Sequence, residues 1–432
     1  MAQAGFGIKR DISGKITSMS IPTLGPDAET ARWIGAKAHQ DYLISNALKQ
    51  FDFFRPSLQQ QAGFHVLAQD GAVLDSTVQE LHTTTRMVHS FALGKIAGVD
   101  NCDEMIDQGM RYLFSHHRDD DHGGFIWALD GDQVHDDRKL AYGHVFTLLA
   151  GASALAVGHP GGAKLIDEVD AVLDRHFWEE DHGLFCDEWN RDWTPFSTYR
   201  GMNANMHGTE ALLSAYEVTG REKYLDRAGR ILGFFLGKIA PSENWRLPEH
   251  YTENWAIDRG YSGDPMFRPA GTTPGHSFEL ARLLLQYWDL KGRPDDGSLH
   301  RARQLTYRAL DDAWDEQKGG LVYTLNFDGT QAITDRYWWP VTEAIGVLAA
   351  LLKCDPQPSD ETWYRKLWIF ADQHFVDHDR SGWFPEVDDK GQPTATQFQG
   401  KPDIYHSIQA VLFPLTAGIS NAYSGLEGRL RP

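Results

Sequence analysis

The chain has 432 residues, of which 41% are hydrophobic and 12% aromatic, as is typical of a globular protein with a large core. It carries 60 acidic and 41 basic residues, a formal charge of -19, which disfavours nucleic acid or an anionic membrane as a partner. The three cysteines show no C-x-x-C spacing, so neither a disulfide framework nor a thiolate zinc site is predicted. Residues 1–15 lack a signal-peptide core and the apolar run 145–157 is too short to span a bilayer, so we expect a cytoplasmic protein.

A loop motif recurs along the chain, about every 60 to 70 residues. It consists of a glycine, a short alternation of apolar or aromatic residues, and Asp-Gly or a near equivalent. Clear copies begin at Gly63, Gly124, Gly320 and Gly382, and weaker ones lie at Gly183 and around 245–255. Alternation closed by Asp-Gly predicts a tight β-hairpin, because these residues tolerate the positive φ of such turns.

The stretches between the hairpins have apolar residues at spacings of three and four, enough for two helices each, as in 140–157 followed by 162–176. Helical pairs this small must stack on their neighbours. We therefore predict an all-α (α/α)6 barrel of inner and outer helices with short β-hairpin loops at one mouth; an open solenoid is the alternative. One domain spans 1–432, with about 1–34 as an N-terminal extension and first turn and about 416–432 as a C-terminal tail.

Polar residues recur near the predicted N-terminal ends of the inner helices, with the same period as the hairpins. They are Arg86, His144, Asn203, Asn205, His207, His276, Glu279, Glu343 and His406. Since those helix ends converge on one mouth, the shared period predicts one shared site. In Pro274-Gly275-His276-Ser277-Phe278-Glu279 the carboxylate follows the histidine by three residues and lies on the same helical face.

Each of these residues also has a structural interpretation. In that interpretation Arg86 forms a structural ion pair and His207 is a hydrogen-bonded core residue. Asp403 caps the N-terminus of a helix, and His406 merely faces the lumen of the ring. The cluster of histidines and aspartates at 116–122 has no recognised ligand spacing, so we interpret it as a solvated charge run and expect no metal site. Several tryptophans near the hairpins offer flat faces on which a sugar ring packs.

Together these motifs resemble the N-acylglucosamine 2-epimerase superfamily. The resemblance rests on Arg86-Met87, the run 199–207, Pro274-Gly275-His276 with Glu279, Trp339-Pro340 with Glu343, and Asp403-Ile404-Tyr405-His406, in this order from about residue 35 to about 415. It is greatest for the aldose-ketose isomerase branch, which includes mannose and sulfoquinovose isomerases. Pro385 and Pro402 stand where the sulfoquinovose branch has two glutamines that recognise the sulfonate, and this departure favours unsubstituted hexoses, mannose above all.

The resemblance implies a role for each matching residue. His276 and His406 would be the acid/base pair, Arg86 and His207 would bind and polarise the sugar oxygens, and Glu279 would orient His276. The remaining substrate-binding positions would be Tyr142, Asn203, His250, Glu343 and Trp339. No metal or other cofactor is implied.

The predicted activity is an aldose-ketose isomerisation, D-mannose to D-fructose, by proton transfer through a cis-enediolate, since a histidine that is largely neutral at cytosolic pH can serve as the base. The expected partner is a small neutral sugar, with no nucleic acid and no membrane, and the protein acts as a monomer or homodimer. Three alternatives stay open: a sugar 2-epimerase that uses the same histidines, an (α/α)6 glycoside hydrolase that uses Glu343 and Glu279, and a sugar-binding module without turnover.

Overall fold

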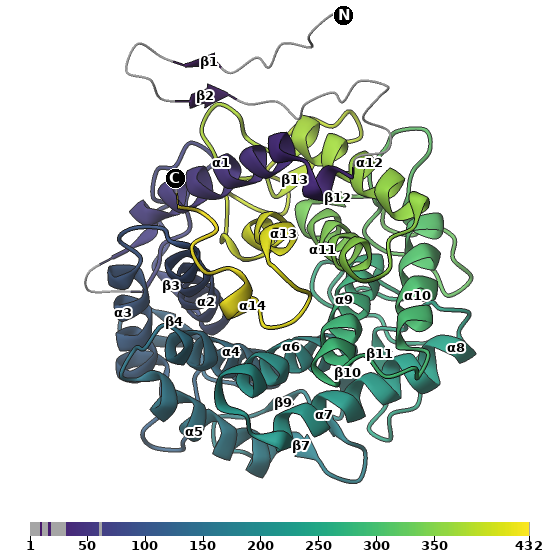
Figure 1. The fold of residues 1–432 in the computed structure, drawn as a ribbon. Coiled ribbons are helices and arrows are strands. Elements are labelled where there is room, and N and C mark those ends of the chain that lie inside the picture. The colour runs from purple at the N-terminus through teal and green to yellow at the C-terminus, as the bar shows by residue number, and fades with distance from the viewer. Residues whose placement is uncertain (1–8, 11–15, 19–31, 60–62, 432) are drawn as a thin grey trace, which may run out of the picture.

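The computed structural model describes residues 9–10, 16–18, 32–59 and 63–431, whose long helices form a closed ring (Figure 1). The inner helices are α2 (Leu81–Ala97), α4 (Ala141–Ala156), α6 (Met202–Thr219), α9 (Pro274–Leu290), α11 (Trp338–Cys354) and α13 (Tyr405–Leu415). The outer helices are α1 (Lys37–Phe54), α3 (Asp103–Tyr112), α5 (Gly162–Val172), α7 (Glu222–Leu232), α10 (Ser298–Ala313) and α12 (Pro358–His374). Because α13 packs on both α1 and α2, the ring closes, which confirms the (α/α)6 barrel and excludes the open solenoid.

The two layers differ in how much of each helix is buried. In α11 every residue from Trp338 to Leu352 is buried, because the helix has neighbours on all sides. In outer helix α7 the buried residues recur at spacings of three and four, as a helix with one solvent face requires. The short helical segments are η2 (Trp33–Gly35), η3 (Arg55–Ser57), η4 (Leu113–His117), η5 (Leu173–Phe177), η6 (Gly233–Ile239), α8 (Ala240–Ser242) and α14 (Ala422–Gly425).

Short antiparallel strands precede and separate the long helices; all but the first two, which Figure 1 shows outside the ring, belong to the loops that join the helices. They are β1 (Lys9–Arg10), β2 (Ile16–Ser18), β3 (Val78–Glu80), β4 (Ala128–Asp130), β5 (Gln133–Asp136), β6 (Lys139–Leu140), β7 (Trp178–Glu179), β8 (Leu184–Phe185), β9 (Glu188–Trp189), β10 (Arg200–Gly201), β11 (His250–Tyr251), β12 (Arg336–Tyr337) and β13 (Glu386–Val387). The pairs are β1–β2, β3–β4–β5, β6–β9, β7–β8, β10–β11 and β12–β13. Since β3, β6, β10 and β12 each lead directly into an inner helix, these sheets hold the helix N-termini at the mouth.

The predicted hairpin turns have the backbone that their sequence requires. Gly131 and Gly329, which follow Asp130 and Asp328, adopt φ values of 57° and 91°. In two further hairpins a tryptophan holds the corresponding left-handed position: Trp193 has φ 65° and Trp255 has φ 58°. Each of these tryptophans donates its backbone N–H to the residue three positions before it, just as Gly329 does. The weaker motif copies are therefore hairpins of the same kind.

The C-terminal segment 416–431 crosses the rear opening of the ring, opposite the hairpins (Figure 1). Leu426 and Leu430 are buried, and the backbone N–H of Leu430 donates to the carbonyl of Ala97 at 2.8 Å. The expectation that this segment is a tail is wrong for 416–431, because its own apolar residues cover the ends of the inner helices. The expected N-terminal extension, about 1–34, lies mostly outside the described residues.

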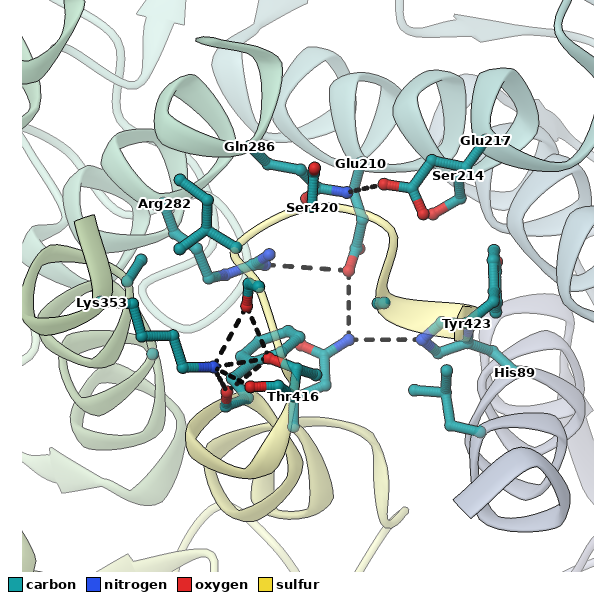
Figure 2. Close-up of a pocket in the computed structure, with 18 residues that line it drawn as sticks. His89, Glu210, Ser214, Glu217, Arg282, Gln286, Lys353, Thr416, Ser420 and Tyr423 are labelled. Carbon is teal, nitrogen blue, oxygen red and sulfur yellow. Dashed lines mark hydrogen bonds and ion pairs between the residues drawn. The ribbon is translucent and has the colours of Figure 1, made fainter. Parts of the chain in front are cut away.

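A small polar cavity of about 50 Å³ lies between this segment and the inner helices, room for ordered water (Figure 2). At its edge the Lys353 ammonium donates to the carbonyl oxygens of Phe413, Thr416 and Gly418 and to the Thr416 hydroxyl. Hydrogen bonds from the buried Lys353 side chain thus help to hold the rear of the barrel closed. Among the described helices, none combines the length and the apolar character that crossing a membrane requires.

Candidate active site

His276 lies in the first turn of α9, where its ring meets a carboxylate from the neighbouring hairpin. Its Nδ1 is 2.9 and 3.0 Å from the two oxygens of Glu249. The backbone N–H of Thr273 also donates to this carboxylate, at 3.1 Å, which holds it in place. A histidine whose Nδ1–H donates to a carboxylate keeps a lone pair on Nε2, the atom that acts as a base.

The second predicted histidine, His406 in the first turn of α13, has a partner of the same kind. Its Nδ1 is 2.9 Å from Glu343 Oε1. Burial, followed by the charge of Arg86, lowers the pKa of His406 to about 3, so the ring is neutral at physiological pH. Burial raises the pKa of Glu343 to about 7. Glu343 was predicted to bind substrate, whereas in the structure one of its oxygens is taken by His406.

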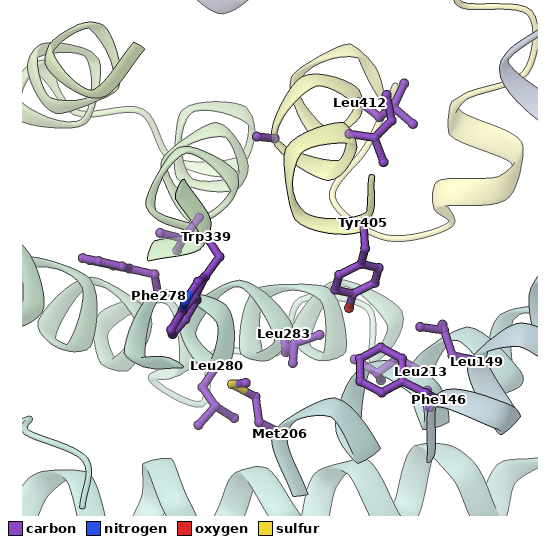
Figure 3. Packing of buried hydrophobic residues seen from close by; sticks show 14 of the residues in the cluster. Phe146, Leu149, Met206, Leu213, Phe278, Leu280, Leu283, Trp339, Tyr405 and Leu412 are labelled. Atoms are coloured by element: carbon purple, nitrogen blue, oxygen red, sulfur yellow. The ribbon is translucent and has the colours of Figure 1, made fainter. Parts of the chain in front are cut away.

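Trp339 lies beside both rings, with centroid distances of 5.0 Å to His276 and 5.9 Å to His406. Figure 3 shows Trp339 and Tyr405 pointing into the same interior region as Phe146, from three different inner helices. Gly275 makes the close approach possible, because a Cβ there would meet the Trp339 ring at 2.2 Å. The sequence therefore places a flat aromatic face between the two predicted acid/base groups.

Arg86 on α2 faces this region, and four side chains contact its guanidinium. Nη1 donates to Asp403 at 3.1 Å and Nη2 to the Tyr142 hydroxyl at 2.8 Å. The rings of Phe146 and Tyr405 each lie 4.7 Å from the guanidinium carbon. Burial opposes the charge, but Tyr142 and Asp403 outweigh it and raise the pKa of Arg86, so the cation is fixed. Arg86 and Tyr142 are thus brought together as predicted, while the Nε of Arg86 has no partner within the described chain.

Deeper in the barrel, three buried glutamates surround one arginine. Arg282 lies 3.8 Å from Glu210, 3.9 Å from Glu279 and 3.7 Å from Glu343. One cation cannot balance three carboxylates, and burial, then the charges of Glu343 and Glu210, raise the pKa of Glu279 well above its usual value. Neither oxygen of Glu279 has a hydrogen-bond partner within 63–431 or the other described ranges.

The structure corrects the role of Glu279. It does not meet His276 but lies 3.3 Å from Nδ1 of His207. Glu279 sits one helical turn further from the mouth than His276, so it reaches the centre of the barrel while the His276 ring turns toward the hairpin that carries Glu249. His207 is neutral, since burial lowers its pKa to about 4. His207 and Glu279 thus form a pair of polar groups below the two histidine–carboxylate pairs.

Two groups of side chains have the spacing of metal ligands. His207, Glu210 and Glu279 place one ligand atom each within 4.8 Å of one another, as do Asp119, Asp121 and His122. At the first group, the guanidinium of Arg282 already supplies a cation to both carboxylates. At the second, Lys139 and Arg191 each bind Asp119 at 2.8 Å. Both groups of carboxylates therefore have a protein cation within ion-pair distance.

The second group also corrects the interpretation of 116–122 as a solvated charge run. Asp119 is fully buried in its ion pairs, and His117 is buried with Nδ1 hydrogen-bonded to the Ile126 carbonyl at 3.0 Å. Only the outer part of the run, such as Asp120 and Asp121, is exposed. The buried part fixes a hairpin of the mouth.

His250 does not offer a ring nitrogen to a ligand, contrary to its expected role in substrate binding. Nδ1 is 2.9 Å from the Tyr199 hydroxyl and Nε2 is 2.7 Å from the Pro269 carbonyl oxygen. Glu249, one position before β11, contacts His276, whereas His250 contacts Tyr199 and Pro269. Its contacts hold the loop before α9 instead.

His144 and Asn205 were also expected at the mouth, but the structure turns both away from it. His144 accepts from the Phe125 backbone N–H at 3.0 Å and lies 2.7 Å from the Leu140 carbonyl; Asn205 accepts from the Phe185 N–H at 2.8 Å. Two residues along a helix correspond to about 200°, so Tyr142 and Asn203 face the lumen when His144 and Asn205 do not. Asn203 keeps a buried oxygen without a partner in the described part of the chain.

Sequence reasoning did not select Glu249, Arg282 or His82, although each lies in this site. Glu249 is adjacent to the selected His250. Arg282 follows Glu279 by three residues on α9, and His82 precedes Arg86 by four on α2, so helical spacing places each beside a selected residue.

The geometry is that of an (α/α)6 barrel with a cluster of histidines and carboxylates at its hairpin mouth. The profile of the N-acylglucosamine 2-epimerase (GlcNAc 2-epimerase) family matches residues 63–410, and the chain belongs to this family. A D-mannose isomerase from Thermobifida fusca is 37% identical over 391 residues, which cover 89% of this chain and 96% of that protein. A crystal structure of D-mannose isomerase superposes with a TM-score of 0.82 at 32% identity, covering 91% and 99% of the two chains.

A more distant structure, cellobiose 2-epimerase from Spirochaeta thermophila, has a TM-score of 0.76 at 22% identity and covers 88% of this chain and 97% of its own. At that identity the likeness is one of fold. The predicted family and fold are confirmed by these comparisons.

Proposed function

We propose that this protein is an aldose-ketose isomerase that converts D-mannose to D-fructose by proton transfer through a cis-enediolate. One observation carries the proposal: two histidines, each with Nδ1 on a carboxylate, lie on one tryptophan close to a fixed guanidinium. The D-mannose isomerases at 37% and 32% identity support the choice of substrate. The enzyme acts in the cytoplasm on a neutral sugar, as a monomer or homodimer, and needs no metal or other cofactor.

In this mechanism His276 moves the proton. Its Nδ1–H is held by Glu249, so Nε2 takes the proton from C2 of the open-chain aldose and returns it to C1. Glu249 stabilises the imidazolium that exists between the two transfers. His406, neutral and held by Glu343, serves ring opening and proton movement at the sugar oxygens.

The negative charge of the enediolate is stabilised by groups that are already in place. Arg86 is held as a cation, and a preorganised donor of this kind supplies about 3 to 4 kcal/mol to a transition state. The N-termini of the inner helices meet at the same mouth and add positive potential. Glu279, whose pKa is raised by burial and by the neighbouring carboxylates, offers an unpartnered carboxyl group to the sugar.

A 2-epimerase is the second candidate, and the similarity of the two histidine–carboxylate pairs favours it. If His276 and His406 face opposite sides of the enediolate, one removes the C2 proton and the other replaces it, which converts mannose to glucose. A glycosidase has less support, because Glu343 is bound to His406 and Glu279 lies beside Arg282.

The test is to follow mannose with the purified protein by proton NMR and identify the first product, with and without EDTA. Fructose as the initial product, formed equally with chelator, is the expected result. Glucose as the initial product would move the assignment to a 2-epimerase. Loss of turnover with EDTA would contradict a reaction that needs no metal, and binding of mannose without turnover would reduce the protein to a sugar-binding module.

A further inference from the structure

A third imidazole stands in the wall of the mouth, one helical turn before Arg86. His82 lies on α2, and a spacing of four residues puts both side chains on the same face of the helix. The His82 ring is nearly parallel to the Trp127 indole, at 10° and a centroid distance of 5.2 Å. The Tyr142 ring, whose hydroxyl binds Arg86, lies 5.9 Å from the His82 ring and 6.1 Å from Trp127.

Among the described residues, His82 keeps a buried ring nitrogen without a hydrogen-bond partner, as His207 does. This atom of His82 is Nδ1, and Glu80 Oε2 is 3.5 Å away. By contrast, His144 and His250 have both ring nitrogens bonded within the protein. A buried polar atom without a partner in the protein calls for one from a ligand or water.

The ring is also open to the mouth and uncharged. The His82 side chain is 19% exposed. Burial, followed by the charge of Arg86, lowers the pKa of His82 well below its usual value. A neutral imidazole presents one donor and one acceptor, and a sugar hydroxyl can pair with either.

We infer that His82 is a specificity-determining residue that binds a sugar hydroxyl on the mouth side of the reacting carbons. The inference rests on the proposed function. Four helical residues place His82 about 6 Å from Arg86 along α2, nearer the mouth. If Arg86 binds the oxygens at C1 and C2, an offset of this size reaches the other end of a hexose, so the bound hydroxyl is the one at C4 or C6.

The experiment compares wild type with His82→Ala and His82→Gln on mannose, 4-deoxymannose and 6-deoxymannose. On mannose, His82→Ala is expected to lower kcat/KM by about 10-fold, the usual cost of a lost hydrogen bond to a buried group, mostly through KM. On the deoxy sugar that lacks the bound hydroxyl, wild type and His82→Ala should be equal. His82→Gln, which keeps a donor and an acceptor, should recover part of the preference.

His135→Ala is the matched control, since His135 is an exposed histidine of the same mouth. An equal loss by His82→Ala on all three sugars would indicate a purely structural role and overturn the inference, as would no loss on any of them. Conversion of mannose by the wild type distinguishes a failure of this inference from a failure of the proposed function. If wild type makes fructose while His82→Ala shows no sugar-dependent effect, only this inference fails.

Discussion

The two ends of the barrel differ in the hydrogen bonds of their most prominent buried polar side chains. At the rear, the Lys353 ammonium has four oxygen acceptors, and Tyr423 of the covering segment lies 3.1 Å from the Ser153 hydroxyl. At the mouth and in the centre, Asn203, Glu279 and the Arg86 Nε keep atoms that no described residue bonds. Both ends are built from the same helices.

This difference separates stability from function. A buried polar group without a partner costs about 1 to 3 kcal/mol, so it persists where a ligand supplies the missing bond. The rear closes the ring through the hydrogen bonds of Lys353 and Tyr423, although Arg282 and Gln409, which line its cavity, keep atoms that no described residue bonds. At the mouth, a bound sugar supplies the hydrogen-bond partners that the protein lacks. Substitutions at the mouth should therefore change turnover at nearly constant stability, and substitutions at the rear should do the reverse.

The largest effect is expected for His276→Asn. Removal of the base should lower kcat by about 10³-fold, the usual contribution of a positioned general base. The melting temperature should stay within about 2 °C of wild type, because the ring is partly exposed and its one partner is Glu249. Steady-state kinetics and calorimetry measure the two quantities. A variant with near-normal kcat would remove His276 from the mechanism.

The second-largest effect is expected for Glu249→Gln, which should lower kcat by about 10²-fold and leave KM nearly unchanged. The amide cannot stabilise the imidazolium as the carboxylate does, although it fills the same space. Glu253→Gln, an exposed residue of the same hairpin, is the matched control. Glu249→Asp should restore part of the rate if Glu249 acts through His276, whereas a purely structural role would show as loss of stability in both variants.

The substitution Lys353→Met tests whether the rear of the barrel contributes to stability. The carbonyls of Phe413, Thr416 and Gly418 lose their donor, so the free energy of unfolding should fall by about 2 to 3 kcal/mol. Urea unfolding measures the change against Lys37→Met, an exposed lysine. At temperatures where the variant is folded, kcat/KM should remain within twofold of wild type. A large loss of activity without loss of stability would contradict the proposal that the rear serves stability and the mouth serves function.

The smallest effect concerns His144, which serves stability although it lies near the mouth. Burial lowers its pKa to about 3, below the ordinary 6.5, so the contribution of the neutral ring is complete above about pH 6.5 and falls steadily as the pH drops below that value. His144→Ala should cost about 2 kcal/mol at pH 7.5, and this cost should shrink by about 1.4 kcal/mol per pH unit below 6.5. Urea unfolding at several pH values measures it, with exposed His300→Ala as control. A cost independent of pH would contradict a neutral buried ring.

Much of the fold could be predicted because the hairpins repeat and the helices between them have clear periodicity. Two hairpins gave weak signals because tryptophan replaces glycine at the left-handed position. Trp193 is held there by stacking on His176 at 3.8 Å, and Trp255 by a hydrogen bond to Glu179 at 2.7 Å. Tertiary contacts that offset an unfavourable backbone conformation leave no local trace in the sequence.

In the site, spacing predicted which helices contribute but not which carboxylate meets which histidine. His276 and Glu279 share a helix, yet Glu249 arrives from a neighbouring hairpin that is distant in sequence.

The covering segment 416–431 was missed because it has no long periodic helix, and its role depends on the rear opening that only the closed ring creates.

The most direct test of the central claim is the isotope content of fructose made from mannose in D₂O. Proton transfer through His276 predicts solvent deuterium at C1 of the product, because the proton on the imidazolium exchanges with solvent during some turnovers, and this label should be unaffected by EDTA. Fructose that contains no deuterium after many turnovers, with all activity lost on addition of EDTA, would instead indicate a metal-assisted hydride shift and contradict the account.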